Sequence, residues 1–260
     1  MVGRFQDRVA LITGGGSGIG RAAAVRLAQE GANVVVMGRR REPLLETVAQ
    51  AEASGAQALA ITADVTLEED VRGAMAETLD RFDRLDVLVA NAGIGGPIKP
   101  IDEVSLEEWE QTQAINVRGV FLAVKHATAS MKARGGGSIV ISASNSGFVA
   151  YPTLATYCTS KGALVMFTRA VALDLVQHNI RVNSVCPGAV DTPMLDEILT
   201  HWGDPVELRP TFGRLCSPME VANVIAFLAS DEAAHMVGSN VMVDYGETCR
   251  PGPIWPSPAF

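Results

Sequence analysis

Short apolar, β-branched runs alternate with longer stretches of helical periodicity along most of the chain. The near-continuous Val, Ile and Leu content of the runs is typical of parallel strands that are covered on both faces. We therefore predict an α/β fold with a doubly wound, seven-stranded parallel sheet and helices on both faces. The predicted strands are residues 8–13, 33–37, 56–63, 86–90, 138–142, 180–186 and 240–244. The predicted helices are residues 21–29, 42–53, 67–82, about 105–131, a helix that contains Tyr157, and 218–230.

Local signals set several of these boundaries. Ser105 with Glu108 three residues later forms a capping box that opens the helix of residues 105–131, and Gly135–Gly137 end it. Pro152 is expected in the first turn of the Tyr157 helix, where its missing N–H has no partner. There is no repeat or linker, so we predict a single catalytic domain over residues 1–246, followed by a Pro-rich tail at 247–260.

Composition and charge narrow the class of protein. Of the 260 residues, 48% are hydrophobic, and the net charge of −8 makes a nucleic-acid partner unexpected. Nothing approaches the roughly 18 consecutive apolar residues of a membrane span, and the N-terminus lacks the apolar core of a signal peptide. We expect a soluble, cytoplasmic protein without a membrane partner. The four cysteines and four histidines are scattered, so no metal site is predicted.

A glycine-rich segment joins the first strand to the first helix. Glycines let the backbone approach a pyrophosphate closely, and the helix N-terminus supplies free N–H groups. The spacing is Gly14-x3-Gly18-x-Gly20, which differs from the common GxGxxG pattern. A tight turn without a ligand is the alternative. We predict a dinucleotide-binding Rossmann fold with cofactor contacts at Gly14, Gly16, Ser17, Gly18 and Ile19.

The end of the second strand bears on the choice of dinucleotide. An acidic residue there binds a ribose 2′-hydroxyl, whereas an arginine accommodates a 2′-phosphate. Here Gly38 is followed by three arginines, residues 39–41. NADP(H) is therefore favoured over NAD(H), with Arg39 as the main phosphate contact. The alternative is a solvated basic start to the next helix, and Ser17 stands where a second basic residue would have strengthened the case.

Tyr157 and Lys161 are one helical turn apart and share a helix face. A free tyrosine titrates near pH 10, and a neighbouring ammonium favours the phenolate and lowers that pKa. Ser144 follows the strand of residues 138–142, at the edge where parallel sheets bind ligands. A chance pair of solvated side chains is the alternative reading of Tyr157 and Lys161.

Taken together, these motifs resemble those of the short-chain dehydrogenase/reductase family, in its compact single-domain branch, over residues 9–246. They are Thr13-Gly14-x3-Gly18-x-Gly20, Asp64, Asn91-Ala92-Gly93, Asn116, Ser144, Tyr157-x3-Lys161, and Pro187-Gly188 followed by Thr192. The resemblance implies hydride transfer between NADP(H) or NAD(H) and a secondary alcohol or ketone. Tyr157 would be the catalytic acid/base and Ser144 would hold the substrate oxygen. Lys161 would bind the nicotinamide ribose, and Asn116 would hold a relay water.

The resemblance also assigns further cofactor contacts. Asp64 and Val65 would flank the adenine, and Val190 and Thr192 would meet the nicotinamide carboxamide. The remaining expected contacts are Asn91, Ala92, Gly93, Pro187 and Gly188. The segment of about 191–217 would be a substrate lid, and the protein would be a homo-oligomer, a tetramer or a dimer.

The lid carries an apolar helix face. Its members are Met194, Leu195, Ile198, Leu199 and Trp202, with Asp196 and Glu197 directed outward. This face favours a neutral, moderately hydrophobic small-molecule alcohol or ketone, although it could merely pack the lid on the sheet. The other wall of the substrate site is predicted to contain Ser144, Val149, Tyr151 and Leu154.

Two features near the C-terminus depart from the pattern of the family. Tyr245 stands where a glycine is usual, and the tail carries four prolines with Trp255 and Phe260. The tail is expected to pack on a neighbouring subunit, with a disordered end as the alternative.

Two other functions remain as alternatives to an alcohol dehydrogenase. They are a reductase of carrier-bound 3-oxoacyl groups and a non-catalytic dinucleotide-binding regulator.

Overall fold

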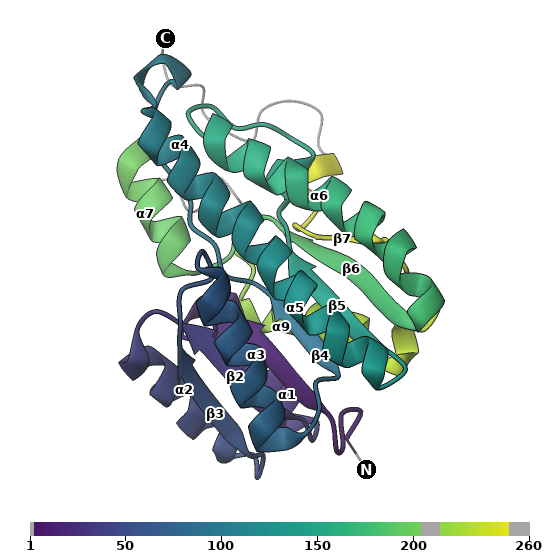
Figure 1. Cartoon of the computed structure of the whole chain (residues 1–260). Coiled ribbons are helices and arrows are strands. Elements are labelled where there is room, and N and C mark those ends of the chain that lie inside the picture. The colour runs from purple at the N-terminus through teal and green to yellow at the C-terminus, as the bar shows by residue number, and fades with distance from the viewer. Residues whose placement is uncertain (1–2, 204–213, 250–260) are drawn as a thin grey trace.

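The computed structural model describes residues 3–203 and 214–249. Its strands form one parallel sheet in the order β3-β2-β1-β4-β5-β6-β7, which confirms the predicted seven-stranded, doubly wound arrangement (Figure 1). The strands are β1 (Val9–Thr13), β2 (Asn33–Gly38), β3 (Ala58–Thr62), β4 (Val87–Ala90), β5 (Gly137–Ser142), β6 (Ile180–Pro187) and β7 (Asn240–Val243).

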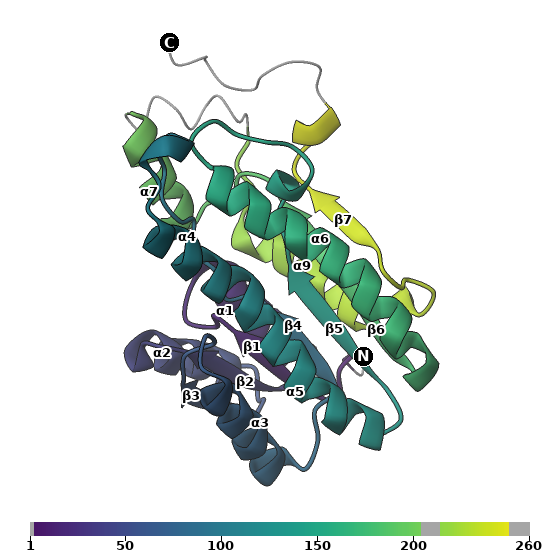
Figure 2. The same ribbon diagram turned by 45° about the horizontal axis from the view of Figure 1, so that its top comes forward.

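Helices cover both faces of this sheet (Figures 1 and 2). The α-helices are α1 (Gly18–Gln29), α2 (Arg41–Glu52), α3 (Glu68–Phe82), α4 (Leu106–Gln113), α5 (Gly119–Ala133), α6 (Ala155–Leu175), α7 (Pro193–Trp202) and α9 (Pro218–Ala229). Short 3-10 turns occur at Ile101–Glu103, Asn145–Gly147, Val176–His178, Asp231–Ala233 and Glu247–Cys249.

The two core layers follow from the alternation of side chains along each strand. In β1, Leu11 packs in the layer under α3, α5 and α6, whereas Ala10 and Ile12 pack in the layer under α1, α2 and α9. Successive residues of a strand point to opposite faces, so a strand buried on both faces must be apolar throughout. All five residues of β1 are indeed buried.

The long helix predicted for residues 105–131 is interrupted. A π-helical segment, Ala114–Arg118, lies between α4 and α5. The predicted capping box is present, because Ser105 Oγ accepts a hydrogen bond from Glu108 N at 3.2 Å and Glu108 Oε2 accepts one from Ser105 N at 2.9 Å. Single π turns within α-helices occur frequently at functional sites. No periodicity of hydrophobic residues distinguishes such a turn from a regular helix.

The expected place of Pro152 in the first turn of the Tyr157 helix is wrong. Helix α6 begins at Ala155, and Thr153 has a φ of +62°. A residue in this left-handed region cannot continue a right-handed helix backward, so Pro152 lies outside it.

Two predicted segments, the substrate lid and the C-terminal tail, are described only in part. The lid segment is described only as α7 and from residue 214 onward, and residues 250–260 of the tail lie outside the described residues. Within residues 3–203 and 214–249, no helix has the length and apolar content needed to span a membrane.

Candidate active site

One cavity of about 460 Å³ opens at the carboxyl ends of the strands. In open α/β sheets this edge is where ligands bind. The predicted cofactor residues that line it are Gly14, Gly16, Ser17, Gly18, Ile19, Arg39, Asp64, Val65, Asn91, Ala92, Gly93, Tyr157, Lys161, Pro187, Gly188, Val190 and Thr192. The predicted substrate residues that line it are Ser144, Tyr151, Leu154, Met194, Leu195, Ile198 and Trp202. The cavity is therefore shared by both predicted sets.

The glycine turn after β1 forms a cradle that side chains would fill. Gly14 and Gly18 have φ values of +66° and +51°, and a Cβ on Gly20 would lie 2.2 Å from Gly14 O. Arg21 Nη2 donates to Gly16 O at 2.6 Å and holds the turn in place. Helix α1 begins at Gly18, and the Ser17 side chain does not cap its N-terminal N–H groups. This close backbone approach and helix N-terminus fit a dinucleotide pyrophosphate.

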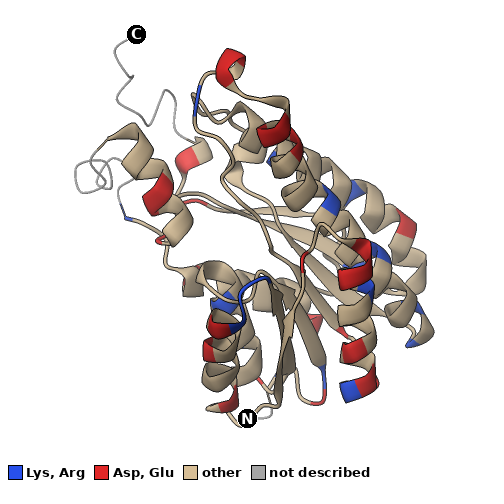
Figure 3. Ribbon diagram, turned by 60° about the vertical axis from the view of Figure 1, so that its left-hand side comes forward, with Lys and Arg blue, Asp and Glu red and all other residues tan. Residues whose placement is uncertain are grey.

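The end of the cavity next to the carboxyl end of β2 is basic. Arg39 and Arg40 are exposed and line the cavity, and residues 39–41 form one continuous blue segment in Figure 3. Within the described part of the chain, neither Arg39 nor Arg40 has an ion pair. Asp64 Oδ1 accepts hydrogen bonds from the backbone N and the hydroxyl of Thr66, each at 2.8 Å, so its carboxylate orders this turn.

Asn91 joins the ends of three strands beneath the cavity. Its Nδ2 donates to Thr13 O at 3.1 Å and to Gly14 O at 3.3 Å, and its Oδ1 accepts from Ser142 Oγ at 3.1 Å. The carboxyl ends of β1, β4 and β5 are thereby fixed relative to the glycine turn. The contributions of Thr13 and Ser142 have no signal in the sequence, because they depend on the order of the strands.

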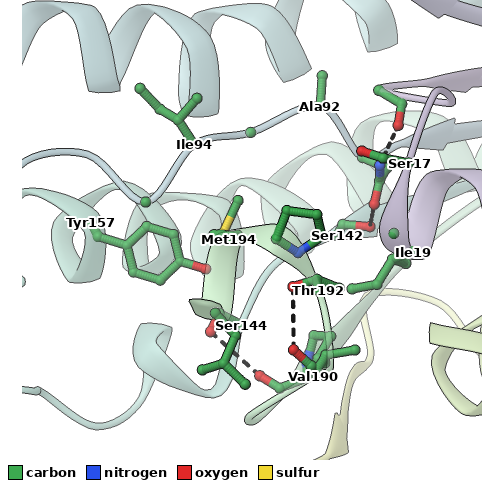
Figure 4. Close-up of a pocket in the computed structure, with 18 of the residues that line it drawn as sticks. Ser17, Ile19, Ala92, Ile94, Ser142, Ser144, Tyr157, Val190, Thr192 and Met194 are labelled. Carbon is green, nitrogen blue, oxygen red and sulfur yellow. Dashed lines mark hydrogen bonds between the residues drawn. The ribbon is translucent and has the colours of Figure 1, made fainter. Parts of the chain in front are cut away.

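Tyr157, Ser144 and Lys161 come together at the centre of the cavity. In Figure 4 the phenol oxygen of Tyr157 lies next to the hydroxyl of Ser144, with Met194 beside them. Lys161 is 5% exposed, and its Nζ lies 5.6 Å from the centroid of the Tyr157 ring. The Nζ donates to Ser142 O at 2.9 Å. The helix spacing and the strand end therefore bring these three groups together, as the sequence predicts.

The expected lowering of the Tyr157 pKa by Lys161 is wrong for this structure. Burial of the hydroxyl raises the pKa of Tyr157 to about 12, although a hydrogen bond with Ser144 opposes this. Burial also lowers the pKa of Lys161 to about 8. Desolvation disfavours both charged forms, and the ammonium donates its hydrogen bond to the backbone carbonyl of Ser142.

Asn116 lies behind the cavity wall. It is fully buried in the π-helical segment, and it is not among the described residues that line the cavity. Its Nδ2 donates to Ile94 O at 2.9 Å and to Ser160 Oγ at 3.0 Å, and its Oδ1 accepts from Ile94 N at 2.8 Å. The side chain thus supports the loop after β4, and its expected relay role stays a prediction. Ser160, which the sequence analysis missed, joins Asn116 to α6.

Helix α7, in the segment predicted to be a substrate lid, divides its apolar side chains between two surroundings. Leu195 and Leu199 are buried beneath the helix, whereas Ile198 and Met194 approach Gly95 to 3.8 Å, measured to a Cβ position built on the glycine. Trp202 Nε1 donates to Thr153 Oγ1 at 3.0 Å, which ties the end of the helix to the loop before α6.

One expectation about the substrate wall needs correction. Val149 is not among the described residues that line the cavity, whereas Asn145 and Ser146, in the 3-10 turn Asn145–Gly147, do line it. Glu197 is exposed, as expected, and it also borders the cavity.

A buried polar pair, Asn145 and Glu247, also lines the cavity and was not predicted from the sequence. Asn145 Nδ2 donates to Tyr151 Oη at 3.0 Å and to Glu247 Oε2 at 2.7 Å. Burial, and then the charge of Glu247, raise the pKa of Tyr151. The position of Asn145 after Ser144 could have suggested it, but nothing in the sequence places Glu247 beside it.

Comparison with known proteins shows the family. The model of the family described as enoyl-(acyl carrier protein) reductase matches residues 14–248. A cyclopentanol dehydrogenase of Comamonas sp. is 43% identical over 96% of this chain and 100% of that protein. A cyclohexanol dehydrogenase of Acinetobacter sp. is 37% identical over 96% of this chain and 98% of that protein. The chain belongs to the short-chain dehydrogenase/reductase family.

Solved structures agree with this assignment. Levodione reductase superposes with a TM-score of 0.91 at 34% identity, covering 95% of this chain and 100% of that one. Carveol dehydrogenase from Mycobacterium avium, in complex with NAD, gives a TM-score of 0.91 at 30% identity, covering 95% of this chain and 100% of that one. The protein is therefore an oxidoreductase whose fold is one that binds nicotinamide dinucleotides.

Proposed function

We propose that this protein interconverts cyclic secondary alcohols and the corresponding ketones, with NADP(H) preferred over NAD(H). The observation that carries the proposal is the meeting of Ser144, Tyr157 and Lys161 in the cavity that the glycine turn also lines. The alcohol dehydrogenases among the relatives, named for cyclopentanol and cyclohexanol, support the choice of a cyclic substrate.

The roles of the three central side chains follow from their protonation. The bound nicotinamide supplies the hydride chemistry. With a pKa of about 12, Tyr157 is a neutral phenol at neutral pH, so it can donate a proton to the oxygen of a ketone. Ser144 holds that oxygen by a hydrogen bond. With a pKa of about 8, Lys161 is mostly protonated at pH 7 and places a positive charge beside the phenol.

The shape and lining of the substrate half support a small, mostly apolar substrate. Met194, Ile198 and Leu154 contribute apolar surface to the cavity that Ser144 and Tyr157 also line. Cavities of roughly 300–1,000 Å³ are typical of small-molecule sites, and this one must hold the cofactor as well as the substrate.

The preference for NADP(H) rests on Arg39 and Arg40. Both line the cavity directly after β2, where no carboxylate follows Gly38 to bind a ribose 2′-hydroxyl. A xylitol dehydrogenase structure among the neighbours is described as bound to NAD+, and it is 33% identical to this chain. The segment after β2 is the feature on which we expect this protein to differ from an NAD-dependent enzyme.

Turnover tests the proposal directly. Purified protein should reduce cyclohexanone with NADPH and oxidise cyclohexanol with NADP+, followed by absorbance of the reduced nicotinamide. Fluorescence titration should show tighter binding of NADPH than of NADH. Tighter NADH binding would overturn the cofactor preference alone, whereas binding of neither dinucleotide would overturn the function.

We also propose that the protein is a homo-oligomer. Large apolar side chains are exposed on neighbouring helices, Leu106 on α4, Phe121 on α5, and Met166 and Leu173 on α6. Helices α4, α5 and α6 lie on the same face of the sheet (Figures 1 and 2). Sedimentation velocity would distinguish a dimer or tetramer from a monomer. The cytoplasmic location expected from the sequence also stays a proposal.

A further inference from the structure

A group of polar side chains forms one wall of the substrate half of the cavity, although the sequence predicts an apolar site. The group consists of Asn145, Tyr151 and Glu247, and we call it the polar wall. All three residues line the cavity, and Asn145 and Glu247 are only 3% and 7% exposed. Buried carboxylates are paired or hydrogen-bonded, and that of Glu247 accepts a hydrogen bond from Asn145. The proposed reaction of Ser144, Tyr157 and Lys161 does not require it.

The carboxylate of Glu247 is held in a fixed position. Asn145 Nδ2 donates to its Oε2 at 2.7 Å, and a Cβ on Gly188 would lie 2.2 Å from the same oxygen. The turn that carries Glu247 is built on Asp244, whose Oδ2 accepts from Thr248 N at 2.9 Å and from Thr248 Oγ1 at 2.7 Å. The lack of a side chain at position 188 thus leaves room for the carboxylate on the cavity wall.

The polar wall is connected to the reacting centre. Ser144 Oγ donates to Asn145 Oδ1 at 3.3 Å, while Asn145 Nδ2 reaches Glu247 and the hydroxyl of Tyr151. A single carboxamide therefore separates the hydroxyl that would hold the reacting oxygen from the carboxylate. A ring bound at Ser144 would occupy the cavity that Glu247 also lines.

The chemistry of the wall indicates which substituent it would bind. An ionised carboxylate only accepts hydrogen bonds and has about four acceptor positions, so it favours a donor and repels an anion. A hydroxyl can donate to Glu247 and also accept from Tyr151, and it would use both groups. An ammonium could only donate. The apolar side chains Met194 and Ile198 of α7 would contact the ring itself.

We propose that Glu247, positioned by Asn145 and beside Tyr151, forms a subsite for a second hydroxyl group on the substrate. The preferred substrate is then a cyclic diol or hydroxyketone, and a ring that bears a carboxylate is rejected. This inference rests on the proposed function, and it names the substrate class of the same site.

The experiment compares cyclohexanol with cyclohexane-1,2-, 1,3- and 1,4-diol on wild type, Glu247→Gln and Glu77→Gln. Glu77 is an exposed glutamate of α3 that does not line the cavity, so it controls for the loss of one charge. We expect wild-type kcat/KM for the best diol to exceed that for cyclohexanol by about tenfold or more, as a hydrogen bond to a charged group provides. Glu247→Gln should remove about tenfold for that diol and change cyclohexanol by less than about twofold, whereas Glu77→Gln should change neither.

A binding readout makes the test independent of turnover. The diol should raise the unfolding temperature of the wild-type protein with bound cofactor more than that of Glu247→Gln. If Glu247→Gln does not fold, Tyr151→Phe should show the same selective loss, because it removes the second partner of the hydroxyl and keeps Glu247.

Several results would overturn the inference. Equal loss on cyclohexanol and diol, with a lower unfolding temperature, would mean that Glu247 only braces the turn. A wild-type enzyme that prefers cyclohexanol or 2-aminocyclohexanol would contradict a hydroxyl subsite. Those outcomes leave the proposed function intact, whereas failure to convert any cyclic alcohol or ketone with either dinucleotide would refute that function. The binding readout would then still decide whether Glu247 recognises a diol.

Discussion

Replacement of Lys161 by methionine tests how much the burial of the lysine charge destabilises the protein without bound cofactor. Lys161 is a 5%-exposed residue within α6, and methionine keeps its unbranched shape and helix propensity. Burial lowers its pKa from 10.5 to about 8 in the folded protein. The unfolded chain returns the lysine to water, where it titrates near its ordinary value.

The size and sign of the effect follow from this difference. A pKa that falls from 10.5 to about 8 corresponds to a cost of about 3 kcal/mol for burying the charged lysine. Between these two pH values the unfolded chain binds more protons than the folded one, so stability rises with pH. The cost is fully present below the folded pKa, and it is lost as pH rises through the unfolded pKa. Between about pH 7 and 9.5, wild type should gain about 2 kcal/mol relative to Lys161→Met.

Urea unfolding at several pH values measures the effect. Subtraction of the Lys161→Met curve from that of wild type removes the contributions of other titrating groups. Lys132→Met, at an exposed lysine of α5, is the matched control and should run parallel to wild type. If wild type and Lys161→Met also ran parallel, the lysine would not be desolvated in the folded protein, and the reasoning about this pair would fail.

Three further predictions concern the turn, the cofactor and the substrate oxygen. Gly20→Ala should lower the unfolding temperature by several degrees and weaken NADPH binding, because its Cβ would lie 2.2 Å from Gly14 O. An unchanged unfolding temperature and unchanged NADPH affinity would show that the turn tolerates a side chain. Arg39→Asp should weaken NADPH binding by about tenfold or more and leave NADH binding within about threefold, and equal effects on both would refute a 2′-phosphate contact. Ser144→Ala should reduce kcat/KM for cyclohexanone by about a hundredfold with little change in NADPH affinity, and a change below about threefold would contradict its role.

The fold could be predicted from the sequence because its signals are local. The apolar runs, the glycine turn and the capping box at Ser105 each determine an element without help from distant residues, and strand ends at one edge of a parallel sheet must share a cavity. Ser144, Tyr157 and Lys161 could be placed together for the same reason.

The rest of the site depends on contacts between distant segments. Asn145 and Glu247 are 102 residues apart, and their hydrogen bond exists because the turn after β7 folds over the end of β6. The pKa direction of Tyr157 was mispredicted because helix spacing gives the distance to Lys161 but not the burial of either group. Val149 was misplaced because the residues after Ser144 form a 3-10 turn whose Asn145 and Ser146 line the cavity, and no periodicity in the sequence indicates this turn.

The measurement that tests the account most directly is the reduction of cyclohexanone by Tyr157→Phe, with NADPH binding followed on the same preparation. Phenylalanine removes only the hydroxyl that donates the proton, and a positioned acid–base group contributes about 10²–10⁴-fold. We expect turnover to fall by at least about a hundredfold while NADPH affinity stays within about threefold of wild type. A variant that keeps more than about a tenth of wild-type turnover would contradict Tyr157 as the acid/base of this site.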